Sequence, residues 1–450
     1  MKISSIKDID VLIIANLEHA SPRIPGLSQY MCSLNDHIRV ITPIKVKNFK
    51  KRWAINGLNK KQFEIIDAPY SGDILQIIRR FLWCIGFAKN KSLTEQLKDK
   101  SNLKDQMNLW RKFKRKIPEY LLIKFQEVFG IPDSEITWYK SAFRVANSEV
   151  KKKRPNFIIS SSPYITSHLV ASKIAKKFNI PWVADFRDTW SNNPIYPYSN
   201  LRRILDQYIE KKIISRSDLV ITVSEMYQKK LREIHKKKIV IIPNGYTSLS
   251  SLFKPCVRSK VLNIVYTGTL YEGYQNYTVF LKAFKNTLEK GFIEKNKIKI
   301  NFYGKYILRL QELIDNLHLS NCVFQKGLVS RERAFEVQRN ADLLLFFSWE
   351  GLEGGLSHLK LYEYLGSMKP ILMVGSKIDF SNQKIIKNTN SGFIGIGINK
   401  ISDLLVELYN KHFNERGIPY NPNMIEIKKN SYCERGKILR NLLISIRNRN

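Results

Sequence analysis

The amino-acid sequence predicts an α/β protein built from two Rossmann-like domains that face one another across a central cleft. The chain has 450 residues, which is enough for two domains of about 200 residues, each with its own core. Short β-branched runs alternate with helical patterns along most of its length, as in parallel α/β folds. The irregular stretch 244–260 separates two such series, so we expect two separate sheets.

The first series lies in residues 1–248, which we expect to form the N-terminal domain. Its strands are predicted at short apolar runs: 11–15, 38–42, 157–160, 182–184, 219–223 and 239–242. Helical periodicity predicts helices over 165–178 and 201–215 between the later strands. The alternation indicates strands that run parallel and connect through helices.

The second series follows a linker at 249–260 and occupies 261–424, the expected C-terminal domain. Its predicted strands are 263–266, 298–302, 342–347 and 371–374, with helices over 278–290 and 308–317. Residues 425–450 contain a basic helix, predicted over 431–446. Ligands of parallel sheets bind at the carboxyl ends of the strands, so the cleft is the expected site.

Residues 71–150 depart from this rhythm and are predicted to form a basic helical insertion. ILQIIRRFLWCIGFAKNK and NLWRKFKRKIPEYLLIKF combine apolar, aromatic and cationic residues. Basic amphipathic helices with Trp and Phe lie well in a membrane interface. A helical insertion that packs on its own domain with a solvated basic face fits the pattern equally well.

The charge of the chain is unusual, since 75 Lys and Arg against 39 Asp and Glu give a formal net charge of +36. Such an excess implies an anionic partner. Nucleic acid is one candidate, but the sequence carries no zinc-finger, RNP or helix-turn-helix signature. The anionic inner leaflet of a membrane is the partner we expect, at about 1 kcal/mol per Lys or Arg near its surface. A Lys-, Asn- and Ile-rich composition that reflects an AT-rich genome is the alternative explanation.

Cysteine usage and hydropathy indicate a cytoplasmic location. The five cysteines are widely scattered and show no C-x-x-C spacing, which argues against a disulfide framework or a structural zinc site. No apolar run approaches the ~18 residues of a transmembrane helix. The apolar run near the start is interpreted as the first buried strand and not as a signal peptide, because no A-x-A-like cleavage site follows it.

The most informative segment is 349–375, WEGLEGGLSHLKLYEYLGSMKPILMVG. A glycine-rich loop containing Gly354 and Gly355 runs into a helix predicted from Ser357 to about Leu365. The exposed amides at the start of such a helix form an anion site of the kind that holds phosphates. Lys360 and Glu363 share one helix face, which places a cation for phosphate beside a carboxylate for sugar hydroxyls. An ordinary loop and helix with a solvated Lys–Glu pair is the alternative for this segment alone.

The stretch HLKLYEYLGSMKPIL resembles the donor-site segment of GT-B glycosyltransferases, in particular those that make bacterial surface polysaccharides. In that family the glutamate at the position of Glu363 binds the nucleotide ribose, and amides of the preceding loop meet the diphosphate and the sugar. The family often carries an E-x7-E pair. Its first carboxylate falls on Gly355 here, so the contact with the sugar that it makes is missing.

The resemblance also implies catalytic residues in the N-terminal domain. PNFIISSSPYITSHL is similar to the family's S-S-S-P-P-x-x-x-H segment and places His168 after a central strand. VADFRDTW is similar to D-x-R-D-P-W, and Asp185, Arg187 and Asp188 are then expected to contact the acceptor or the leaving phosphate. Structural readings stay open for both segments: a hydrogen-bonding histidine, and an arginine paired with either aspartate.

Further donor and acceptor contacts follow from the same resemblance. IVYTGTLYEG places Gly268 and Thr269 after the first strand of the C-terminal domain, where the family's loop faces the diphosphate. Thr269 stands where many members have an arginine, so we expect Lys360 first and Lys305 second to meet the phosphate charge. On the acceptor side, HASPRIPGLSQY is expected to be a flexible, close-approach loop with Arg23 and Gly26.

Together these features predict a retaining, metal-independent glycosyltransferase that moves a sugar from a nucleotide-diphosphate donor to a hydroxyl. The acceptor is expected to be a lipid-linked glycan in cell-surface polysaccharide biosynthesis, with the enzyme peripheral on the inner face of the membrane. No cofactor or metal is predicted, because the D-x-D at Asp8–Asp10 precedes the first strand. The alternatives are a non-catalytic GT-B partner subunit, a nucleotide-sugar epimerase and a nucleic-acid-binding protein.

Overall fold

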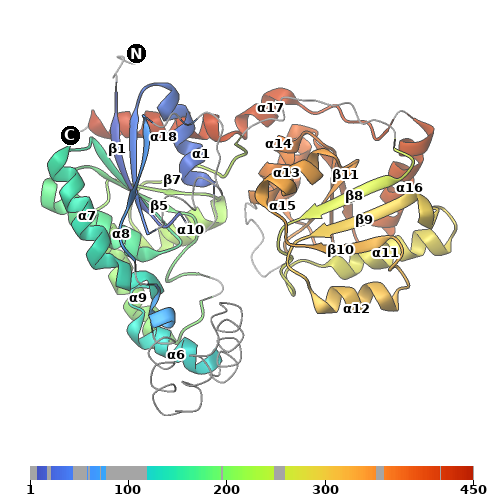
Figure 1. Cartoon of the computed structure of the whole chain (residues 1–450), viewed down its shortest axis with the longest axis horizontal. Helices are drawn as coiled ribbons and strands as arrows, with labels where there is room; N and C mark the ends of the chain where they lie inside the picture. Colours follow the sequence, from blue (N-terminus) through green and yellow to red (C-terminus); the bar gives the residue numbers. More distant parts are fainter. Residues whose placement is uncertain are drawn as a thin grey trace, which may run out of the picture.

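In the computed structural model, two parallel sheets form the centres of two α/β domains (Figure 1). The structure describes residues 8–17, 22–43, 58, 61–70, 72–77, 119–193, 196–247, 259–350, 359–415 and 417–448. The first sheet has the order β3-β2-β1-β4-β5-β6-β7 and the second the order β10-β9-β8-β11-β12-β13. The prediction of two Rossmann-like α/β domains is confirmed.

The strands of the first sheet all pair in parallel. They are β1 (Asp10–Ala15), β2 (His37–Thr42), β3 (Phe63–Asp67), β4 (Phe157–Ser161), β5 (Trp182–Phe186), β6 (Leu219–Thr222) and β7 (Ile239–Ile241). Helices α1 (Arg23–Ser33) and α18 (Tyr432–Arg447) pack on one face, and α7 (Tyr139–Lys152) and α8 (Ile165–Phe178) on the other. Alternate residues of β1 point into the two cores, so burial on both faces explains its unbroken apolar sequence.

The second sheet is built in the same way. Its strands are β8 (Leu262–Thr267), β9 (Ile298–Tyr303), β10 (Val323–Gly327), β11 (Leu343–Phe347), β12 (Ile371–Gly375) and β13 (Gly392–Ile396). Its helices are α11 (Tyr277–Glu289), α12 (Leu308–Asn316), α13 (Arg331–Arg339), α14 (Leu359–Ser367), α15 (Phe380–Thr389) and α16 (Ile398–Asn414). The remaining elements are α6 (Glu119–Phe129), α9 (Asn200–Ile214), α10 (Glu225–Ile234), α17 (Met424–Lys429) and the 3-10 turns η1 (Ser134–Trp138) and η2 (Lys295–Lys297).

Strands β3, β10 and β13 were not predicted, and they share one physical property. Each is an edge strand or carries partly exposed side chains along most of its length. Such strands have no continuous apolar run, and the apolar run was the signal used to find the others. The helix predicted to stop at Gly366 continues through Ser367, and the chain turns at Met368 with a φ of 55°.

Residues 71–150, predicted to form a basic helical insertion, are not an insertion over their whole length. Residues 78–118, which hold most of the two basic stretches, lie outside the described residues. The later part belongs to the domain itself, since α7 buries Ala142, Ala146 and Val150 in the core next to Ile158. Among the described residues, no helix combines the length and hydrophobicity needed to cross a bilayer.

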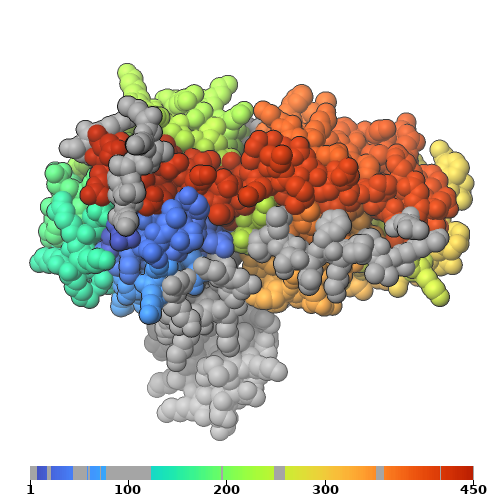
Figure 2. Space-filling model, turned by 90° about the horizontal axis from the view of Figure 1, so that it is seen from above, coloured from blue at the N-terminus to red at the C-terminus, as the bar shows by residue number. Residues whose placement is uncertain are grey.

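The C-terminal end of the chain joins the N-terminal domain. Figure 2 shows the red C-terminal segment lying across both halves of the molecule. Leu439, Leu443 and Ile444 of α18 enter the core of the first sheet beside Ile24 and Leu27 of α1. The Arg440 guanidinium donates to the buried Asp36 carboxylate from Nε at 2.6 Å. Gly436 permits the close approach of the two helices, since a Cβ there would lie 2.4 Å from the Leu27 carbonyl oxygen.

Candidate active site

The chain crosses twice between the two sheets, and the two halves of the molecule meet at these crossings. Tyr246, on the way out, forms a parallel bridge with Ser431, on the way back. The Tyr246 amide donates to the Asn430 carbonyl at 3.2 Å, and the Tyr432 amide to the Tyr246 carbonyl at 2.9 Å. Leu359, the first described residue of α14, packs against the core of the first sheet. The predicted donor helix therefore lies against the N-terminal domain.

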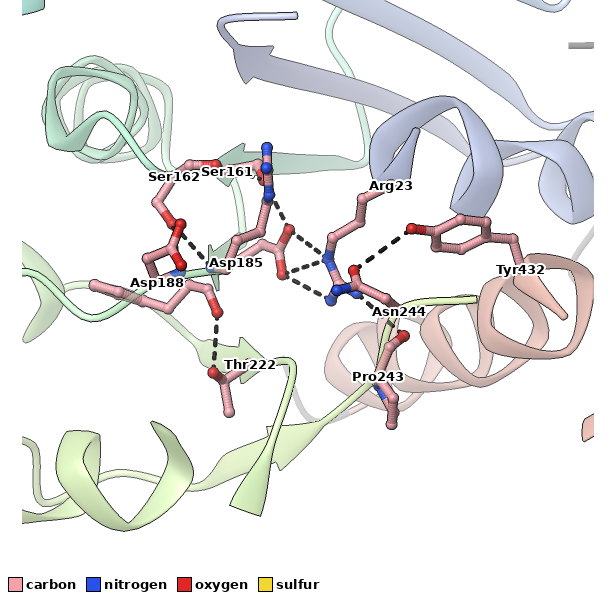
Figure 3. A network of polar contacts seen from close by, with 11 residues as sticks. Arg23, Ser161, Ser162, Asp185, Asp188, Thr222, Pro243, Asn244 and Tyr432 are labelled. Atoms are coloured by element: carbon pink, nitrogen blue, oxygen red, sulfur yellow. Dashed lines mark hydrogen bonds and ion pairs between the residues drawn. The ribbon is translucent and has the colours of Figure 1, made fainter. Parts of the chain in front are cut away.

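A buried ion pair organises the carboxyl edge of the first sheet (Figure 3). Arg23 is fully buried, and its Nε and Nη2 donate to both oxygens of Asp185 at 2.9 to 3.2 Å. Its Nη1 donates to the Pro243 carbonyl at 3.2 Å. The Ser161 hydroxyl donates to Asp185 Oδ2 at 2.8 Å. All acceptor positions of the carboxylate thus face protein groups.

This geometry corrects the prediction for Arg23, Gly26 and Asp185. Arg23 and Gly26 do not form a flexible loop; they lie in the first turns of α1 and are buried. A Cβ on Gly26 would meet the Tyr432 ring at 2.5 Å, so the close approach that this glycine permits is to α18 and not to an acceptor. Asp185 is occupied by Arg23 and Ser161, and no surface remains for a substrate to contact.

His168 is also a structural residue. It is fully buried in α8, and its Nδ1 shares a hydrogen bond of 2.7 Å with the Ser160 hydroxyl. Its ring stacks on Phe186 with centroids 4.7 Å apart. Burial lowers the pKa of His168 to about 3, so the ring is neutral at physiological pH. The ring is enclosed in the core, so the structure supports the hydrogen-bonding alternative, and the catalytic role stays a prediction.

Arg187 and Asp188 remain as the partly exposed groups of the predicted catalytic set. The Ser162 hydroxyl accepts from the Arg187 amide at 2.8 Å, which fixes the backbone after β5. The Tyr227 hydroxyl donates to Asp188 Oδ1 at 3.3 Å. Burial lowers the pKa of Arg187, and the nearby Asp188 and Asp185 oppose this shift. The two side chains are held at the sheet edge that faces the second domain.

In the second domain, Lys360 lies beside a glycine turn. Gly268 follows β8 with a φ of 110°, and a Cβ there would meet Lys360 Cε at 3.0 Å. A Cβ on Gly304, after β9, would lie 2.2 Å from the Gly268 carbonyl oxygen. Only glycines therefore allow the two loops and the lysine to come together. Thr269 and Lys305 flank this cluster and are both exposed.

The ammonium group of Lys360 lies over an aromatic ring, and its pKa is lower than that of an ordinary lysine. Its Nζ lies 3.7 Å from the centroid of the Tyr266 ring and donates to the Tyr266 hydroxyl. Burial lowers the pKa of Lys360 to about 7, although the neighbouring Glu363 opposes the shift. A lysine of this kind gains a full charge when an anion binds beside it.

Glu363 lies one turn further along α14 and pairs with a residue that the sequence analysis did not single out. Arg331 Nη2 donates to Glu363 Oε1 at 2.9 Å, and both side chains are partly exposed. Burial raises the pKa of Glu363, while Arg331 and Lys360 oppose this. Ser330 caps α13 and places Arg331 in its first turn, after β10. Since β10 was not predicted, nothing in the sequence indicated that Arg331 follows the carboxyl end of a strand.

Tyr432 lies near charged groups of both halves. It is fully buried at the start of α18. Burial raises its pKa to about 12, and Arg23 and Arg187 from one domain oppose this while Glu363 from the other supports it. The groups of both domains are therefore close enough to act on one phenol.

Gly354 and Gly355 lie outside the described residues, so their predicted contacts with the diphosphate stay predictions. The residues before them are ordered by packing: Trp349 stacks on Tyr274 with centroids 4.7 Å apart. The Glu350 carboxylate accepts from the Ser376 hydroxyl at 2.6 Å and from the Ser376 amide. Within the described ranges no group of three or more His, Cys, Asp or Glu side chains converges as a metal site would require.

We expect Asp185→Asn to destabilise the protein and not merely to slow a reaction. Removal of the carboxylate leaves the Arg23 guanidinium buried without a counter-charge, which costs about 3–5 kcal/mol. Urea unfolding should show this loss, whereas the control Asp188→Asn, at a partly exposed position, should stay within about 1 kcal/mol. Unchanged stability of Asp185→Asn would contradict the structural assignment.

Comparison with known proteins supports a glycosyltransferase architecture. The family model described as Glycosyltransferase Family 4 matches residues 109–247. HepE of Anabaena, solved with UDP-glucose, is 11% identical and covers 97% of this chain and 100% of its own, with a TM-score of 0.60. A glycosyltransferase of Rickettsia africae is 13% identical and covers 98% of both chains, with a TM-score of 0.57. Sucrose-phosphate synthase of Thermosynechococcus elongatus is 12% identical over 97% of this chain and 100% of its own, with a TM-score of 0.54.

At these identities the likeness to solved structures concerns the fold. No curated protein matches the sequence closely enough to count as a relative. The chain therefore has the GT-B fold, and over residues 109–247 its N-terminal half carries the sequence pattern of Glycosyltransferase Family 4.

Proposed function

We propose that this protein is a retaining, metal-independent glycosyltransferase that transfers a sugar from a nucleotide-diphosphate donor to a hydroxyl group. The observation that carries the proposal is the cluster at the carboxyl edge of the second sheet. There Lys360 lies beside the Gly268 turn, and Glu363 lies one turn away with Arg331. Gly268, Lys360 and Glu363 were expected from the sequence to bind a donor, whereas Arg331 was not.

Each member of this cluster has a role that suits its chemistry. Lys360 and the open backbone at Gly268 would meet the diphosphate, because a partly desolvated ammonium interacts strongly with phosphate. Glu363 would accept hydrogen bonds from the ribose hydroxyls through its carboxylate oxygens. Arg331 pairs with that carboxylate and opposes the rise of its pKa that burial causes. Lys305 is a further cation at the rim of this cluster.

The chemical step would depend on stabilising the leaving group. Loss of a nucleotide diphosphate gives an oxocarbenium-like transition state, with negative charge building on the departing phosphate. Lys360, and the amides of the loop with Gly354 and Gly355, would stabilise that charge. Arg187 and Asp188 would face the reaction from the N-terminal domain, where they could contact the acceptor hydroxyl or the leaving phosphate. No carboxylate is assigned as a nucleophile.

The acceptor that we propose is a lipid-linked glycan of cell-surface polysaccharide biosynthesis. The net charge of +36 supports an enzyme that works at an anionic membrane surface, where such acceptors are found. We therefore place the enzyme on the cytoplasmic face of the membrane as a peripheral protein.

A thermal-shift screen with UDP-, GDP-, dTDP- and CMP-sugars, with and without magnesium, tests the donor proposal. A magnesium-independent rise in Tm with one nucleotide class is expected, since a ligand that binds only the folded state stabilises it. The absence of a shift with every compound would leave a non-catalytic GT-B subunit as the better explanation.

Glu363→Ala should weaken binding of the active nucleotide sugar by about tenfold to a hundredfold, because hydrogen bonds to a carboxylate are lost. The Tm of the free protein should change little, since the side chain is partly exposed. Isothermal titration measures the affinity. Glu336→Ala is a matched control, because Glu336 also pairs with an arginine, Arg333, but at the exposed surface of α13. Equal losses in both variants would rule out the ribose contact.

Affinity for the same donor should fall as the pH rises above about 7. A bound diphosphate favours the charged form of Lys360, so binding takes up a proton once the free lysine, with its pKa of about 7, has lost it. The decrease should approach about tenfold per pH unit at most, measured by titration between about pH 6.5 and about 8.5. Lys360→Gln should bind more weakly and with no such pH dependence. A wild-type affinity that is flat over this range would show that Lys360 does not meet the phosphate.

A further inference from the structure

Helix α9 buries three charged side chains and exposes four large apolar ones. Arg202, Asp206 and Glu210 follow one another at intervals of one turn, and all three are buried. Arg202 Nε donates to Asp206 Oδ1 at 2.8 Å, and Glu210 Oε1 pairs with His235 Nε2 at 3.0 Å. The three buried charged side chains of this helix thus have hydrogen-bond partners inside the domain.

The opposite face of α9 presents an apolar stripe to the surroundings. Leu201 is 81% exposed, Ile204 65%, Leu205 42% and Tyr208 63%. Their spacing of three, four and seven residues puts them on one side of the helix. In a water-soluble domain this is the face that would normally be polar.

Helix α6 continues the apolar surface. The Arg202 guanidinium joins the two helices, since it donates from Nη2 to the Gly130 carbonyl at 2.7 Å and from Nη1 to the Glu127 carbonyl. The exposed side chains of α6 include Val128 and Phe129, and Phe129 stacks on Phe125 with centroids 6.1 Å apart. We call the exposed residues of both helices the α6–α9 face: Phe125, Val128, Phe129, Leu201, Ile204, Leu205 and Tyr208.

The charges around the α6–α9 face are basic. The exposed charged residues of α9 are Arg203, Lys211 and Lys212, because its two acidic residues are buried. Lys212 lies 5.9 Å from the centroid of the Tyr208 ring. On α6, the exposed Lys124 pairs with Glu127, which is partly buried. Figure 1 places α6 and α9 at the end of the N-terminal domain opposite α18.

We propose that the α6–α9 face docks on the surface of an anionic lipid bilayer. Aliphatic and aromatic side chains beside a rim of lysine and arginine are the composition of a helix surface that lies in a membrane interface. The basic rim complements anionic headgroups, and tyrosine fits the boundary between headgroups and acyl chains. The inference deepens the peripheral location within the proposed function and identifies the surface responsible.

Vesicle sedimentation tests the apolar part of the proposal. The full-length protein should bind phosphatidylcholine–phosphatidylglycerol vesicles, and Leu201→Ser/Ile204→Ser/Tyr208→Ser should reduce the partition coefficient about tenfold or more. A control variant of similar exposure on the other domain, Leu308→Ser/Ile378→Ser/Phe380→Ser, should bind like the unmodified protein. Equal binding of the α9 variant would overturn the proposal.

The charged part is tested by Arg203→Gln/Lys211→Gln/Lys212→Gln. This variant should lose affinity for vesicles that contain phosphatidylglycerol, by about fivefold per charge removed, and much of its sensitivity to salt. Equal binding of the unmodified protein to pure phosphatidylcholine vesicles would overturn the electrostatic part. Hydrogen exchange provides a readout that needs no variant: amides of 200–214 should gain protection with anionic vesicles, and unchanged exchange would count against docking there.

Other occupants of the face give different results. If a second copy of the chain covers it, the unmodified protein is a dimer, the α9 variant is a monomer, and vesicle binding is the same for both. If another part of the chain covers it, the α9 variant melts at a lower temperature with unchanged vesicle binding. Either result overturns the proposal. Vesicle binding needs no nucleotide sugar, so failure of the donor screen and failure of membrane docking are separate outcomes.

Discussion

The buried ion pair between Arg23 and Asp185 is the constraint on which the N-terminal half depends. A guanidinium that is fully removed from water must have its charge balanced by protein groups. Here the first turn of α1 supplies the cation, β5 supplies the carboxylate and Pro243 supplies a carbonyl. Three segments far apart in the sequence are thereby fixed at one edge of the sheet. The start of the crossing to the second domain is fixed with them.

The same constraint decides which polar groups remain available for a ligand. The Asp185 carboxylate accepts hydrogen bonds from Arg23 and Ser161, and the buried His168 ring packs against aromatic side chains. Arg187 and Asp188, which come directly after, reach the edge that faces the other domain. The four residues predicted to be catalytic thus divide into two buried groups, Asp185 and His168, and two partly exposed groups.

In the second half, the charged groups of the candidate site are not fully buried. Lys360, Glu363 and Arg331 are partly exposed and placed around glycine turns, where a ligand can approach the backbone. The protein supports Lys360 with an aromatic ring and a hydroxyl instead of a close carboxylate. Burial therefore lowers its pKa in the free protein, and an anionic ligand would favour the charged form. Tyr432, buried at the crossing, lies within reach of the charges of both halves.

The sequence by itself determined the α/β class, the two sheets and the segments that carry the candidate site. Central strands are buried on both faces, so their apolar runs are visible without a structure, as for 11–15 and 371–374. Edge strands such as β10 bury little, and with β10 the sequence analysis also missed Arg331 as the partner of Glu363. The burial of Arg23 and Asp185 was decided by tertiary structure alone, because Arg23 lies 162 residues from Asp185 and 220 residues from Pro243 in the sequence. The exposure of the apolar side of α9 was also decided by tertiary structure. Only the position of the helix on the domain decides which of its faces meets water.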